Sequence, residues 1–166
     1  MSDRSQTIRI PPNGTRGTSM PFAGALGKLF KPVINMQIAR YRRSTSPSPP
    51  VMMGFPTVLL TTTGSRSGLE RTSVLGGFPD GEEAWLLVAS KSGARTHPAW
   101  FINLARSPDK VWLEVGPLKF KAKVESLQGA AREAALERVA AVSPRYAGYQ
   151  RKTDREIPVM RVKPAV

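Results

Sequence analysis

The chain has 166 residues, 40% of them hydrophobic, which fits one domain with a real core and excludes a globally disordered protein. Its 25 basic and 12 acidic residues give a net charge of +13, so we expect an anionic partner such as a phosphorylated cofactor, nucleic acid or an acidic membrane surface. It has no cysteine, which excludes disulfides, thiolate nucleophiles, iron–sulfur clusters and cysteine zinc sites.

The N-terminal third of the chain is predicted to stand apart from the folded unit. Met1–Met20 is polar and has no periodicity, so we expect a disordered leader. Phe22–Arg43 has apolar residues at three- and four-residue spacing beside a basic face, which predicts an amphipathic helix that its internal proline kinks. For this helix, packing on the domain or covering the ligand site is favoured over contact with a membrane surface. The proline-rich Ser44–Pro50 is predicted to be a linker, which divides the chain into residues 1–54 and a folded domain over residues 55–166.

Short strands dominate the predicted domain. Strands are predicted over Val58–Thr63, Arg71–Phe78 and Trp85–Ala89, which are rich in β-branched and leucine residues. The remaining predicted elements are a helix from Pro98 to about Arg106, a hairpin of Lys110–Val115 with Phe120–Glu125, a helix over Gln128–Val142 and a strand over Ile157–Val162. The connections between paired strands are too short for crossover helices, so the fold class is expected to be α+β with a mainly antiparallel small barrel or bent sheet.

Two turns rich in small residues carry cations. Turn 1 is Gly64–Gly68, followed by Arg71, and turn 2 is Ser90–Arg95. Small residues let backbone N–H groups approach a ligand, and arginine and lysine supply charge, so these turns suit a phosphate or carboxylate. The alternative, that the arginines are solvated and that Trp100 belongs to the core, stays open from the residues alone.

Several common catalytic motifs are missing from the sequence. There is no GxGxxG after a strand, no GK[ST] loop, no evident carboxylate pair and no obvious nucleophile. The one histidine, His97, precedes a proline and is expected to be structural, and no metal site is predicted. These absences favour chemistry that a bound cofactor carries while the protein supplies position and electrostatics.

Three segments resemble a known family. TTTGSRSGLER, ASKSGARTHPAWFINL and PRYAGYQRKTDREIPV resemble, in order and spacing, the deazaflavin-dependent nitroreductase family, which uses coenzyme F-420 and includes quinone reductases. The resemblance covers about Pro56 to Val162. It implies a split β-barrel related to FMN-binding oxidoreductases, and an enzyme that transfers hydride from the reduced deazaflavin to an electron-poor acceptor such as a quinone, an activated alkene or a nitro compound.

The resemblance also implies roles for individual residues. The cofactor-binding set would be Arg66, Ser67 and Arg71 on the phosphate and oligoglutamate tail, Ser90, Lys91, Ser92, Gly93 and Ala94 along the tail and ring, and Ala99, Trp100 and Asn103 at the ring. Tyr146 and Tyr149 would face the second substrate and, with Ser90, form the catalytic set.

Two positions depart from the family pattern. Ser65 stands where a second basic residue is usual, which predicts a modestly weaker hold on the tail. Ser143-Pro144 stands where Tyr-Pro is frequent, which favours a more open or more polar acceptor pocket.

Two alternative functions remain beside the reductase: a flavin-using relative on the same barrel, and a non-catalytic carrier of the coenzyme. Nucleic-acid binding is not expected, because aromatic residues make up only 7% of the chain and do not interleave with the basic runs. No segment reads as a membrane span or a secretory signal, so we expect a cytoplasmic protein. Peripheral membrane contact through the basic N-terminal helix is the alternative.

Overall fold

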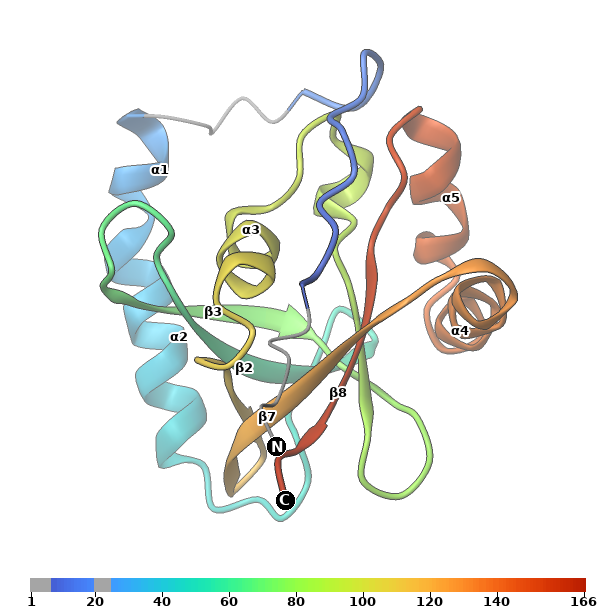
Figure 1. The fold of residues 1–166 in the computed structure, drawn as a ribbon. Helices are drawn as coiled ribbons and strands as arrows, with labels where there is room; N and C mark the ends of the chain where they lie inside the picture. Colours follow the sequence, from blue (N-terminus) through green and yellow to red (C-terminus); the bar gives the residue numbers. More distant parts are fainter. Residues whose placement is uncertain (1–6, 20–24) are drawn as a thin grey trace, which may run out of the picture.

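A strongly bent antiparallel sheet forms the centre of the computed structural model, which describes residues 7–19 and 25–166 (Figure 1). The strands are β1 Val51–Met52, β2 Phe55–Thr63, β3 Glu70–Gly76, β4 Phe78–Pro79, β5 Trp85–Val88, β6 Trp112–Val115, β7 Leu118–Leu127 and β8 Val159–Pro164. The helical elements are α1 Ala25–Leu29, α2 Lys31–Arg43, the short turn η1 Lys91–Gly93, α3 Ala99–Arg106, α4 Gly129–Val142 and α5 Arg145–Lys152.

The strands pair in the order β1-β2-β6-β7-β8-β5-β4, and β3 pairs with β2. Every pair is antiparallel. The long strand β7 pairs with β6 through its first half, where Lys121 faces Trp112, and with β8 through its second half, where Val124 faces Val162. Because one strand serves both partners, it bends the sheet into a barrel-like shape, and the predicted antiparallel α+β barrel is confirmed.

Strand β2 is buried at successive positions because both of its faces are covered. In β2, Val58 and Leu60 face the central core, whereas Leu59 between them packs against Ile38 and Tyr41 of α2. Side chains alternate between faces along a strand, so a strand covered on both sides needs no polar face.

Helix α2 is anchored to the barrel by its C-terminal half. Tyr41 donates its hydroxyl hydrogen to the carbonyl of Thr57, with the two oxygens 2.9 Å apart, and the same hydroxyl accepts the N–H of Gly116. Arg42 binds both carboxylate oxygens of Glu114 at 2.9 Å. The predicted kink is confirmed, because α1 and α2 are separate helices that break at Phe30. Residues 22–24 of the predicted helix lie outside the described residues.

The expectation of a disordered leader is wrong for residues 7–19, which form an extended strap along the barrel (Figure 1). Ile8 is buried in the central core. The N–H of Gly14 donates to the carbonyl of Arg95 at 2.8 Å, and Thr18 forms a parallel bridge with Ala94. The ordered strap could not be predicted from its composition, because it is held by partners far along the chain. Residues 1–6 and 20–24 lie outside the described residues.

Helix α5 was not predicted from the sequence. Its sequence, RYAGYQRK, buries no residue fully and contains Gly148, so it has no apolar stripe to reveal a helix. It is held by ring contacts of Tyr146 with Phe55 and Phe78, and by close packing against turn 2. The two-residue strands β1 and β4 were also not predicted, because such short segments carry no periodicity.

Candidate functional site

Turn 1 is held in place by helix α3. The N–H of Ser65 donates to the Oδ1 of Asn103 at 2.9 Å, and Asn103 is only 8% exposed. Arg66 and Ser67 project into solvent from the same turn. Asn103 therefore positions turn 1, while its role toward a bound ring stays a prediction.

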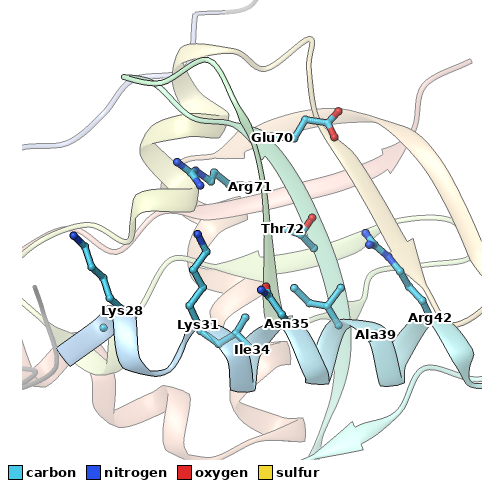
Figure 2. Close-up of a pocket in the computed structure, with 11 residues that line it drawn as sticks. Lys28, Lys31, Ile34, Asn35, Ala39, Arg42, Glu70, Arg71 and Thr72 are labelled. Carbon is cyan, nitrogen blue, oxygen red and sulfur yellow. The ribbon is translucent and has the colours of Figure 1, made fainter. Parts of the chain in front are cut away.

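A groove of about 710 Å³ lies between α1–α2 and strand β3 (Figure 2). Its lining residues are Gly27, Lys28, Lys31, Ile34, Asn35, Ile38, Ala39, Arg42, Glu70, Arg71 and Thr72. The side chains of Lys28, Lys31 and Arg71 point into the same open space from opposite walls. Arg71, a predicted tail-binding residue, thus belongs to a cationic groove. The two lysines were not predicted as site residues, because they were assigned only to the basic face of the predicted helix Phe22–Arg43.

Turn 2 adopts an unusual backbone conformation. Lys91, Ser92 and Gly93 have successive positive φ angles of 44°, 54° and 80°. A Cβ at Gly93 would lie 2.8 Å from the Cβ of Lys152 and 2.9 Å from the carbonyl oxygen of Tyr149, so only glycine lets α5 pack this closely on the turn. Lys91 donates to Thr96 at 3.0 Å, and burial, with a smaller effect of the Arg155 charge, lowers the pKa of Lys91.

A fully buried arginine ties turn 2 together. Arg155 is 1% exposed, and its guanidinium donates to the carbonyls of Ala94 at 2.9 Å, Ala89 at 3.1 Å and Ser90 at 2.9 Å. Burial lowers the pKa of Arg155. This residue lies in the third segment of the family resemblance, but nothing in its sequence context shows that it turns inward. It holds the backbone that presents the predicted coenzyme-binding residues.

His97 links this arginine to the N-terminal strap. Its Nε2 lies 2.7 Å from the carbonyl oxygen of Pro11, which can only accept, and its Nδ1 lies 2.9 Å from a guanidinium nitrogen of Arg155, which can only donate. The ring is therefore neutral and protonated on Nε2. Burial lowers the pKa of His97 and outweighs the opposing effect of the hydrogen bond to Pro11, while the Arg155 charge lowers this pKa further. The expected structural role of His97 is confirmed.

Acid is expected to destabilise the protein through His97. Because its pKa is lower in the folded state than the unfolded value of 6.5, its contribution is fully present above pH 6.5 and is lost as the pH falls through the folded pKa. Each unit of pKa lowering is worth about 1.4 kcal/mol. Urea unfolding between pH 8 and pH 5 measures this loss. His97→Gln keeps one donor and one acceptor but does not titrate, so its stability should be flatter over this range; equal pH dependence of both proteins would contradict the assignment.

The two predicted substrate tyrosines contact each other. Tyr146 and Tyr149 meet edge to face with ring centroids 5.1 Å apart, and Tyr146 also contacts Phe55 and Phe78. Burial raises the pKa of Tyr146 to about 12, so its phenol keeps its proton at neutral pH. Both tyrosines line a smaller groove of about 240 Å³ beside α4 and α5.

Ser143 is a buried junction residue between α4 and α5. Its N–H donates to Val139, and its carbonyl accepts the N–H of Tyr146. The departure from the family pattern therefore lies directly before the tyrosine pair. Its predicted effect on the acceptor pocket stays a prediction.

Strand β3 connects the cationic groove with the tyrosine pair. Arg71 lies near its start, and a Cβ at Gly76, its last residue, would lie 2.9 Å from the Tyr146 hydroxyl. Five residues of strand span roughly 17 Å. Among residues 7–19 and 25–166, no described hydrogen bond, ion pair or ring contact joins the groove cations directly to the tyrosines. The two groups thus lie at the two ends of one strand.

The predicted ring-binding residues of α3 differ in exposure. Ala99 is exposed, whereas Trp100 is only 8% exposed and packs in the central core against Phe101, with ring centroids 6.3 Å apart. The sequence-based alternative that Trp100 belongs to the core therefore describes its position. Phe101 and Leu104 are fully buried, as predicted.

The family model and the curated relative that match this chain name the same family. The family model described as F420H(2)-dependent quinone reductase matches residues 33–164. The F420H(2)-dependent quinone reductase of Mycobacterium tuberculosis strain H37Rv is 38% identical over 108 residues, which cover 63% of this chain and 71% of the relative. The solved structure of the F420-H2 Dependent Reductase FDR-A has 37% identity and a TM-score of 0.59, and covers 65% of this chain and 94% of that chain. A structure described as a domain-swapped dimer has 30% identity and a TM-score of 0.60, and covers 80% of this chain and 98% of that chain.

Proposed function

The chain belongs to the F420H(2)-dependent quinone reductase family, and on that premise we propose that it transfers hydride from reduced coenzyme F-420 to a quinone. The observation that carries the proposal is that the family match spans both cationic turns and the tyrosine pair in one barrel. The enzyme is thus an oxidoreductase that relies on a deazaflavin for its chemistry.

The residues present fit the coenzyme. Its phosphodiester and oligoglutamate tail are anionic, and the groove beside Arg71 gathers cations from two walls. Lys91 is partly desolvated, so an anion near it would be strongly attracted. Turn 2 presents a backbone that Arg155 already fixes, so little ordering is needed on binding.

When bound, the reduced deazaflavin supplies a hydride, and the quinone needs one further proton to become the hydroquinone. In our proposal turn 2 and Ala99 position the ring, while Arg66, Ser67 and Arg71 hold the tail. Tyr146 keeps its proton at neutral pH, so it can donate a hydrogen bond to the acceptor oxygen but does not act as a base. Tyr149 and Ser90 complete the proposed catalytic set, and solvent provides the last proton.

Activated alkenes and nitro compounds are proposed as further acceptors. The small, buried Ser143 directly before the tyrosine pair supports a more open acceptor pocket, which suits activated alkenes, whereas the missing family tyrosine argues against reduction of nitroimidazoles. A yellow protein that releases FMN would instead favour the flavin-using alternative. Tight binding without turnover of any acceptor would favour the carrier.

A fluorescence titration tests the binding step of this proposal. Purified protein titrated with oxidised coenzyme F-420 is expected to give saturable binding at micromolar concentrations. A flat titration at those concentrations would contradict the proposal.

We further propose peripheral contact of α2 with an anionic membrane surface. Val33 and Met36 of α2 are exposed and do not line the groove, and the exposed Arg40 shares their face of the helix. No helix in the described ranges, residues 7–19 and 25–166, has the length and apolar character needed to cross a bilayer. The expected cytoplasmic location stays a prediction.

Vesicle sedimentation tests this contact. The protein should sediment with anionic vesicles, and Val33→Glu combined with Met36→Glu should abolish this without changing coenzyme affinity. Failure of the unmodified protein to sediment with anionic vesicles would refute the contact.

A further inference from the structure

We propose that α1 and α2 form one wall of the coenzyme's tail site, and that Lys28 and Lys31 bind the carboxylates of its oligoglutamate tail. The inference rests on the proposed function and deepens it by assigning tail recognition to this chain's N-terminal helices. The juxtaposition that carries it is the open space shared by Lys28, Lys31 and Arg71 in Figure 2.

The helix geometry places the cations along the groove. Lys31, Asn35, Ile38 and Arg42 follow at spacings of four, three and four residues, so they share one face of α2, and all four line the groove. From Lys31 to Arg42 this face is roughly 17 Å long. An extended chain of about five residues fits that length, so a short glutamate tail can follow the groove.

One end of the groove carries an excess of positive charge. Arg42 is neutralised by its bidentate contact with Glu114. Glu70 lies on the far side of Arg71 from both lysines in Figure 2. The end of the groove near Lys28, Lys31 and Arg71 is therefore positive, and adjacent exposed cations gain from a polyanion that neutralises them together.

Turn 1 lies beside the groove and carries a single cation, Arg66. Ser65 brings no charge to turn 1, and its N–H is already bound to Asn103. The lysines supply positive charge beside the same hairpin, from residues that precede the family match at residues 33–164. They thus place positive charge beside turn 1, where Ser65 itself supplies none.

Helix α2 is anchored to the barrel by its C-terminal half, and its first turns are not. The helix is buried only at Ile38 and Tyr41, near its C-terminal end, whereas its first turns lie exposed along the groove. Carboxylates bound between Lys31 and Arg71 would tie these exposed turns to β3.

The test compares two ligands with one double variant. Lys28→Gln combined with Lys31→Gln should raise the Kd of the tailed coenzyme about tenfold or more, the effect of losing charge-assisted contacts. The Kd of the precursor deazaflavin, which lacks phosphodiester and glutamates, should change less than about twofold, within the free energy of a single weak surface contact. Lys110→Gln with Lys123→Gln removes the same charge from exposed positions outside the groove and serves as the matched control.

The outcomes separate this inference from the function it rests on. An unmodified protein that binds neither ligand contradicts the proposed function itself. If the unmodified protein binds the tailed coenzyme and the double variant binds it equally well, only the assignment of Lys28 and Lys31 is overturned. Equal weakening by the control pair would likewise overturn it, because net charge would then explain the effect.

Discussion

Replacing Arg155 by methionine is expected to lower the free energy of unfolding by about 3 to 5 kcal/mol and to weaken coenzyme binding. The substitution removes the donors to three backbone carbonyls and to His97, all in a dry interior. Methionine fills similar space but leaves these acceptors unsatisfied. Turn 2 would lose the group that fixes its strained backbone, and the strap would lose its link through His97. Urea unfolding and the fluorescence titration measure the two effects.

Two further variants keep this prediction testable. Arg155→Lys retains the charge with a single donor group, so its stability should lie between those of the unmodified protein and Arg155→Met. Arg151→Met removes an exposed arginine from nearby α5 and should change stability by less than about 0.5 kcal/mol. Equal unfolding curves and equal Kd values for Arg155→Met and the unmodified protein would show that the buried guanidinium does not organise the turn.

Truncating Arg71 or Lys91 to alanine is expected to raise the Kd of the coenzyme about tenfold each, corresponding to about 1.4 kcal/mol per contact. Arg71 lines the cationic groove, and Lys91 lies partly buried on turn 2, where burial lowers its pKa. An anion beside Lys91 would stabilise its charged form, which strengthens the attraction. The measurement is the same titration, repeated at two salt concentrations, because charge contacts weaken with ionic strength.

Lys110→Ala is the control for net charge, since Lys110 is exposed and lies outside the groove. It should leave the Kd within about twofold of the unmodified value. If both Arg71→Ala and Lys91→Ala bind the coenzyme with unchanged affinity, the tail site is assigned to the wrong residues.

The sequence was sufficient for the barrel and for the two turns because both rest on local patterns. Alternating or continuous apolar runs predicted the strands, and Phe101 and Leu104 were placed correctly in the core by their spacing on α3. Glycine, serine and arginine clusters marked the turns, which lie at the ends of β2 and β5.

The rest depended on contacts between distant segments, which no local pattern records. Arg155 reads as one basic residue in a polar run, yet it is buried against carbonyls more than sixty residues away. The strap around Ile8 and Pro11 has no periodicity, and its order comes from the core and from His97. Lys28 and Lys31 look like a solvated helix face until the helix is seen to form the wall of a groove.

The most direct test of the central claim is anaerobic oxidation of reduced coenzyme F-420 by a soluble naphthoquinone in the presence of the purified protein. The account predicts saturable, protein-dependent oxidation in which one hydroquinone forms for each coenzyme oxidised, since hydride carries both electrons. A coenzyme that binds to the protein but is oxidised no faster than in its absence, for every quinone tried, would contradict the claim that this barrel is a quinone reductase.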